Sequence, residues 1–155
     1  MNSIQDSDPR LGIFDKLFAL KVGIYITVVE IWLRKHGVLK CQTALAKLAE
    51  RPRLLHKKPI DQQAEVQRIC ELVEYGNKRF TAYPADCLSR SLVLQYLLRS
   101  HGIDAKLKLG VRNTTGRFES HAWVEHNARP LNEAERVHDI YTEIDWNRER
   151  SGPQP

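Results

Sequence analysis

The apolar pattern of the chain changes its period at Gly102, and this change constrains the fold more than any other feature. Before Gly102, apolar residues recur every three or four positions, which is typical of amphipathic helices. After it, apolar and polar residues alternate, which is typical of strands with one buried face. Helices that precede antiparallel strands predict an α+β domain, and 155 residues suffice for one such domain with a real core.

The pattern predicts four helices followed by three strands. Asp61 is the expected N-cap of the third helix. The helices end at glycine or before proline, and turn-forming residues separate the strands. We expect helices over residues 10–35, 38–50, 61–76 and 87–102, and strands over 105–111, 118–124 and 139–146. We expect residues 1–60 to form an N-terminal helical extension and residues 61–150 to form the core domain.

Cysteine usage and an apolar run bear on the compartment. Three cysteines at irregular spacing cannot form a complete disulfide framework, so we expect a reduced, cytoplasmic protein. Residues 17–33 are mostly apolar but include Lys21 and Glu30. Two charges in so short a run argue against a membrane span and favour a buried or partner-facing helix. Peripheral membrane contact stays open for this segment.

The net charge of +5 is concentrated in one segment. Residues 34–58 contain eight Lys or Arg and one acid, Glu50. A solvated basic face is the simplest interpretation, with an anionic partner as the alternative. We expect no nucleic-acid partner, because no aromatic residues interleave with the basic ones and no binding motif accompanies them.

A cysteine begins one of the predicted helices, and a histidine follows on a predicted strand. Cys87 stands at the N-terminus of the helix over 87–102, where unpaired N–H groups and the helix dipole stabilise a thiolate. His121 lies in the strand over 118–124, and an imidazole can take a thiol proton and pass it to a leaving amine. The pair is a candidate thiol acyl-transfer site. The alternative is a hydrogen-bonded strand histidine beside a core cysteine.

Alternation along the strand places His121 on the face opposite the apolar residues. We expect His121 to reach the start of a helix packed on the sheet, with Trp123 packed beside the site. The two faces carry Glu119, His121, Trp123 and Glu125 on one side and Phe118, Ser120, Ala122 and Val124 on the other.

The other two cysteines have a simpler interpretation. Cys41 and Cys70 fall on the apolar stripes of their predicted helices, so we expect both to be small core residues. A zinc site that combines them with Cys87 lacks metal-ligand spacing. We therefore expect no metal and no cofactor.

Two sequence blocks resemble a known family. The first begins at Cys87 and reads Cys-Leu-x-Arg-Ser-Leu-x-Leu-x-x-Leu-Leu-Arg. The second begins at Phe118 and reads Phe-x-x-His-Ala-Trp-Val-Glu, followed by Pro-Leu-Asn from Pro130. In content and order these blocks resemble the leader peptidases of lasso-peptide biosynthesis, a branch of the transglutaminase-like thiol fold. The resemblance covers residues 86–133, about a third of the chain.

The resemblance implies a catalytic triad. The catalytic Cys and His of the family fall on Cys87 and His121, and its third member, usually Asp, falls on Glu133. A strict two-residue turn at Asn127-Ala128 places Ala134 opposite His121, so we expect a bulge or a three-residue loop to bring Glu133 there. The rivals for the third role are Asp139 and Asp145.

The resemblance also implies a function: removal of the leader from a ribosomally made lasso-peptide precursor by a Cys-His-acid acyl-enzyme mechanism. Family members of this length lack a leader-recognition domain, so the implied partners are the precursor, a separate small leader-recognition protein and a macrolactam-forming cyclase. The basic segment and the first helices are the expected docking surface. Two alternatives stay open: a thiol transamidase of the same fold, and a non-catalytic leader-binding scaffold.

Overall fold

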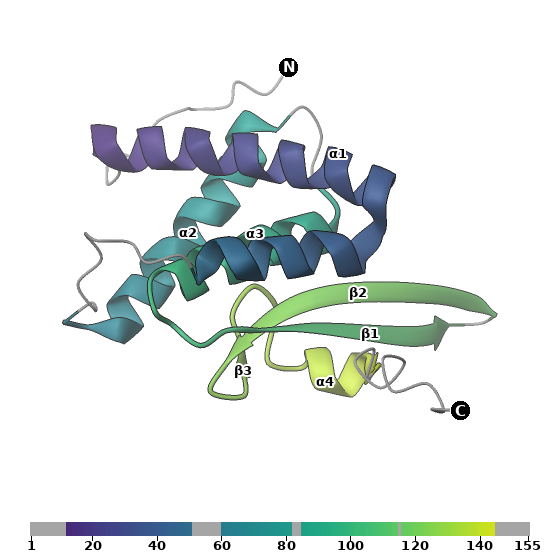
Figure 1. The fold of residues 1–155 in the computed structure, drawn as a ribbon. Helices are drawn as coiled ribbons and strands as arrows, with labels where there is room; N and C mark the ends of the chain where they lie inside the picture. The colour runs from purple at the N-terminus through teal and green to yellow at the C-terminus, as the bar shows by residue number, and fades with distance from the viewer. Residues whose placement is uncertain (1–11, 51–59, 82–84, 115, 145–155) are drawn as a thin grey trace, which may run out of the picture.

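A computed structural model describes residues 12–50, 60–81, 85–114 and 116–144. Its elements are three long helices, a four-stranded antiparallel sheet and one short helix. The long helices cover one face of the sheet, and the short helix lies on the other side (Figure 1). The predicted α+β class, with N-terminal helices before a small antiparallel sheet, is confirmed.

Helix α1 (Ile13–Ala49) consists of two helices joined at Gly37. Gly37 has a φ of 77°, which favours glycine, and here the chain reverses so that the two halves form a hairpin (Figure 1). The predicted break between two N-terminal helices is therefore confirmed.

Helix α2 (Gln62–Phe80) begins at its predicted cap, where the Asp61 side chain accepts a hydrogen bond from the backbone N–H of Ala64. The predicted end at Gly76 is wrong, because the helix continues for another turn. Gly76 is instead where α2 touches α1: an added Cβ would lie 2.6 Å from the carbonyl oxygen of Ala19. The glycine therefore serves close helix packing.

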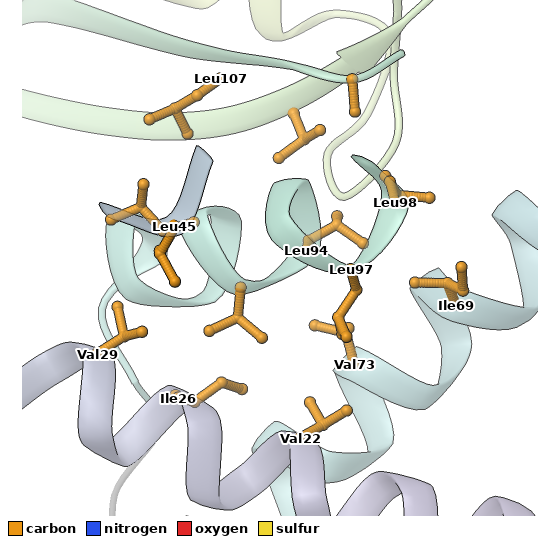
Figure 2. Close-up of a cluster of buried hydrophobic side chains, with 14 of the residues drawn as sticks. Val22, Ile26, Val29, Leu45, Ile69, Val73, Leu94, Leu97, Leu98 and Leu107 are labelled. Carbon is orange, nitrogen blue, oxygen red and sulfur yellow. The ribbon is translucent and has the colours of Figure 1, made fainter. Parts of the chain in front are cut away.

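Helix α3 (Cys87–Ser100) is the centre of the core. Its leucines contact α1 and α2 on one side and the sheet on the other (Figure 2). Both halves of α1 contribute side chains to the same cluster, among them Ile26 and Leu45. The division into a helical extension over 1–60 and a core domain over 61–150 stays a prediction.

The sheet has the order β3-β2-β1-β4. Strands β1 (Lys106–Thr114) and β2 (Arg117–His126) form a long hairpin, and Gly110 pairs with His121. Ala122 and Val124 join the core beneath α3, as predicted for their face. Phe118 is 80% exposed, so its predicted burial is wrong. The hairpin projects beyond the helices at its turn (Figure 1).

A strand does lie within the predicted range 139–146, but it is shorter and begins later than predicted. The chain forms the short helix α4 (Val137–Ile140) and then β4 (Thr142–Glu143), which pairs with β1. Residues 10 and 11 of the predicted first helix and residues 145 and 146 of the predicted last strand lie outside the described residues. Among the helices that are described, none is long and apolar enough to cross a membrane.

Candidate functional site

Cys87 is the first residue of α3 and is half-buried against the core. Asp86 before it is exposed and does not cap the helix with its side chain. Its backbone carbonyl accepts hydrogen bonds from Ser89 Oγ and the N–H of Arg90. The approach to the helix is fixed by Asn77, whose buried Oδ1 accepts from the N–H of Ala85 at 3.2 Å. The helix start is thus tied to α2.

The other two cysteines pack in or against the hydrophobic core. Cys41 is fully buried, which confirms its predicted core position, and burial raises the pKa of its thiol. Cys70 is half-buried against the core, and burial together with nearby Glu71 raises its pKa to about 11. Both thiols are protonated at neutral pH and therefore poorly nucleophilic.

His121 lies on the sheet face that points away from α3. Its ring stacks on Tyr141 with centroids 5.0 Å apart and on Trp123 at 6.3 Å. Trp123 is fully buried, and its indole N–H donates to Glu125, so the predicted packing beside the histidine is confirmed. Gly110 opposite leaves room for the rings, because a Cβ there would lie 2.9 Å from the Trp123 ring.

An acid and a guanidinium complete the surroundings of the histidine. His121 Nε2 lies 2.9 Å from Glu133 Oε1, and the same oxygen accepts from Arg90 Nη2 at 3.1 Å. Arg90 also pairs with Glu74 on α2 at 3.4 Å. Asp139, a rival for the acidic role, is exposed on α4. The other rival, Asp145, lies outside the described residues. The catalytic role of Glu133 stays a prediction.

Glu133 reaches the histidine without the expected bulge, and that expectation is wrong. Asn127 and Ala128 both have positive φ and form a two-residue turn. Pairing with β2 continues through β3 (Arg129–Pro130) to the N–H of Leu131, which donates to the carbonyl of Val124. Beyond this point, the side chain of Asn132 replaces the backbone as acceptor for the N–H of Val124. The backbone is then free to leave the ladder.

Two adjacent residues of α3 are matched to two adjacent residues of this loop. Arg90 contacts Glu133, and Ser91 Oγ accepts from Asn132 Nδ2 at 3.0 Å. Ser91 also donates to the carbonyl of Ala122, next to the histidine. The helix that Cys87 begins is therefore fixed in register to the strand that carries His121.

The structure does not join Cys87 directly to His121. In the described part of the chain, Cys87 Sγ makes no hydrogen bond to His121. The core residues Ala122 and Val124 occupy the sheet face beneath α3, so the histidine is linked to the helix around the sheet edge, through Glu133 and Arg90. Arg90 lies one helical turn from Cys87.

A groove of about 1120 Å³ opens beside this linkage. Helices α2 and α3 and residues 131–134 line it, and Arg90 and Glu133 stand in its wall. Leu131 supplies apolar surface, and Cys70 also contributes to the wall. Over the same described residues, no three His, Cys, Asp or Glu side chains are grouped to hold a metal ion.

Sequence reasoning missed the residues that hold the site together. Arg90, Ser91 and Asn132 stand within the blocks that carried the family resemblance, but no role was assigned to them. A signal was available, because polar residues interrupt the apolar surface of the Cys87 helix at Arg90, Ser91 and Gln95. Polar residues in such positions are buried only when they are paired.

The chain resembles known proteins in sequence. Residues 28–145 match the sequence model of the transglutaminase-like superfamily. A stretch of 57 residues is 42% identical to the microcin J25-processing protein McjB of Escherichia coli. This stretch covers 37% of the present chain and 26% of that protein. No solved structure matches the chain.

Proposed function

The chain belongs to the transglutaminase-like superfamily, and from this premise we propose that it is a cysteine peptidase that removes the leader from a lasso-peptide precursor. The observation that carries the proposal is the His121–Glu133 pair, held by Arg90 to the helix that Cys87 begins. The similarity to a microcin J25-processing protein supports a peptide precursor as substrate, although it spans about a quarter of that protein.

The proposed mechanism assigns one role to each nitrogen of the histidine. With Nε2 donating to Glu133, Nδ1 is left to take the proton of the Cys87 thiol. The thiolate attacks the carbonyl carbon at the leader–core junction, and His121 returns the proton to the departing core amine. Water then attacks the thioester, which releases the leader as a carboxylic acid and restores the thiol.

Two further groups support this chemistry. The backbone N–H of Cys87 is at the start of α3, where a helix has no internal acceptor for it, so it is the proposed oxyanion donor. Arg90 is a positioning residue in this scheme, because it holds the carboxylate that orients the imidazole. Cys87 and His121 are not hydrogen-bonded, and His121 lies on the sheet face that points away from α3. The scheme therefore requires a rearrangement that brings the two side chains together when substrate binds.

The groove beside Glu133 is the proposed binding site for the precursor peptide. It runs along α2 and α3 and offers both apolar and charged walls. A small leader-recognition protein and a macrolactam-forming cyclase are the proposed partners. The missing Cys87–His121 hydrogen bond favours one second candidate, a leader-binding scaffold in which the thiol takes no part.

Intact-mass analysis separates the two functions. Wild type and Cys87→Ala are incubated with the precursor peptide and the recognition protein of the same gene neighbourhood, and Cys41→Ala serves as the cysteine control, because Cys41 is buried away from the groove. The peptidase predicts a leader-sized product from wild type and Cys41→Ala, and intact precursor with Cys87→Ala. Cleavage by Cys87→Ala would refute the assignment. Intact precursor throughout, with binding demonstrated, would make the chain a scaffold.

A further inference from the structure

The first half of α1 exposes a continuous apolar row. Its members are spaced four, three, four, four and three residues apart, which keeps them on one face of a helix. Their exposed fractions range from 41% at Leu20 to 65% at Ile13, and Phe14 beside the row is 81% exposed. We call this row the α1 stripe; it consists of Ile13, Leu17, Leu20, Ile24, Val28 and Ile31.

Folding of the chain does not account for the stripe. The opposite side of the same helix already supplies the core with Val22, Ile26 and Val29 (Figure 2). A surface helix normally carries polar residues on its outer face, and a contiguous exposed apolar patch marks an interaction site. At 1.5 Å per residue the stripe is about 27 Å long.

The residues that border the stripe are basic. On a helical wheel, Lys21 borders one side, Lys16 borders the other, and Lys35 follows the last apolar residue. The two acids of this half-helix are paired with arginines, Asp15 with Arg68 and Glu30 with Arg34, each at 2.7 Å, so these lysines set the charge of the border. The surface that covers the stripe must therefore tolerate or supply negative charge.

This border disfavours a second copy of the chain. Two stripes packed together would bring their lysines and arginines face to face, and like charges across an interface are unfavourable. The shape of this surface favours a flat partner. The first half of α1 lies at the side of the molecule farthest from the sheet, as a straight ridge (Figure 1). A flat surface can contact such a ridge along its whole length.

We propose that the α1 stripe binds an anionic lipid surface, with the helix parallel to the membrane plane. Apolar side chains enter the headgroup boundary, and the bordering lysines meet the lipid phosphates. The sheet that carries His121 then faces water, because it lies on the other side of the molecule (Figure 1). This binding does not depend on the proposed peptidase activity.

Vesicle sedimentation tests the proposal with the full-length chain. The probes are phosphatidylcholine vesicles and vesicles in which a quarter of the lipid is phosphatidylglycerol. The variants are Ile24→Glu in the stripe, Lys21→Glu at its border, and Phe118→Glu as the control, because Phe118 is also an exposed apolar residue but lies on the distant hairpin. All three positions are on the surface, so the variants should fold, which circular dichroism checks.

Wild type and Phe118→Glu should bind the anionic vesicles more tightly than the neutral ones. Lys21→Glu should lower the partition coefficient about fivefold or more, and Ile24→Glu by more than about tenfold. No preference for anionic vesicles would overturn the proposal. It would equally be overturned by light scattering that finds a dimer dissociated by Ile24→Glu, or by a stripe-dependent complex with the recognition protein in the absence of vesicle binding.

Discussion

Two helices of this chain are apolar over most of their circumference, but they differ in how much of their apolar surface is buried. Helix α3 is enclosed by α1, α2 and the sheet, so its apolar residues are accounted for by the core. The first half of α1 is enclosed on one side only and leaves the α1 stripe exposed. The informative residues are therefore the exceptions in each helix: polar residues that are buried in α3 and apolar residues that are exposed in α1.

The buried polar residues of α3 are kept at a cost. Ser91 is fully buried but completely paired, with Ala122 on one side and Asn132 on the other. Arg90 is less well accommodated, because its Nε is buried without a hydrogen-bond partner among the described residues. A fold that needed only stability would place an apolar residue there. The guanidinium contacts Glu133 instead, which supports the positioning role proposed for Arg90.

The largest expected effect comes from a change in the polar network that α3 forms with Glu133. Glu133→Gln should lower kcat/KM for precursor cleavage by about 10²- to 10⁴-fold, because the imidazole loses its ionised partner. Glu74→Gln is the matched control, since Glu74 also pairs with Arg90 but lies on α2 and is not an ion-pair partner of His121. Cleavage kinetics for both variants, with equal thermal unfolding curves, make the measurement.

Equal losses in the two glutamate variants would contradict the assignment, because they would trace the effect to the Arg90 network as a whole rather than to the histidine partner. A full loss in Asp139→Asn together with an active Glu133→Gln would transfer the acidic role to Asp139.

A second prediction sharpens the comparison through stability. Leu94→Ala in α3 should lower the free energy of unfolding by about 2–5 kcal/mol, because it leaves a cavity in the core. Leu17→Ala in the α1 stripe should change it by less than about 0.5 kcal/mol, because Leu17 is 56% exposed. Urea unfolding followed by circular dichroism measures both. A loss at Leu17 as large as that at Leu94 would mean that the stripe is covered within the monomer.

The smallest effect concerns the thiol of Cys70, which is half-buried at the edge of the core. Burial raises the pKa of Cys70 from 9.0 to about 11. Between these values the unfolded chain loses the thiol proton and the folded chain keeps it, so the contribution of Cys70 to stability falls as pH rises from 9.0 to about 11. The unfolding free energy of wild type relative to Cys70→Ala should therefore decrease over this range, by less than about 2 kcal/mol. A difference that does not change with pH would contradict the burial of this thiol.

Local patterns predicted the elements that obey local rules. The break at Gly37, the cap at Asp61 and the change from helices to a hairpin after Gly102 follow from backbone preference and apolar period. The predictions were wrong where contacts with distant segments of the chain determine the structure. Gly76 serves contact with α1 rather than a helix end, and Phe118 extends past the helices that would have covered it. No local pattern carries that information.

The candidate site divides in the same way. Cys87 and His121 were identified from residue type and position, and Glu133 from the family resemblance. The hydrogen bond that joins α3 to the loop after β3 could not be predicted, because its partners, Ser91 and Asn132, are 41 residues apart in sequence. The bulge predicted before Glu133 was wrong because a side chain, that of Asn132, can replace the backbone as a hydrogen-bond acceptor.

The most direct test of the central claim, that Cys87 is the reactive thiol of the chain, needs no substrate. The wild-type protein is treated with iodoacetamide at pH 6 to 7, and modification of each cysteine is followed by peptide mass mapping. Cys87 should be modified first, while Cys41 and Cys70 react slowly because burial raises the pKa of both. Modification of Cys87 no faster than of Cys41 and Cys70 would contradict the account.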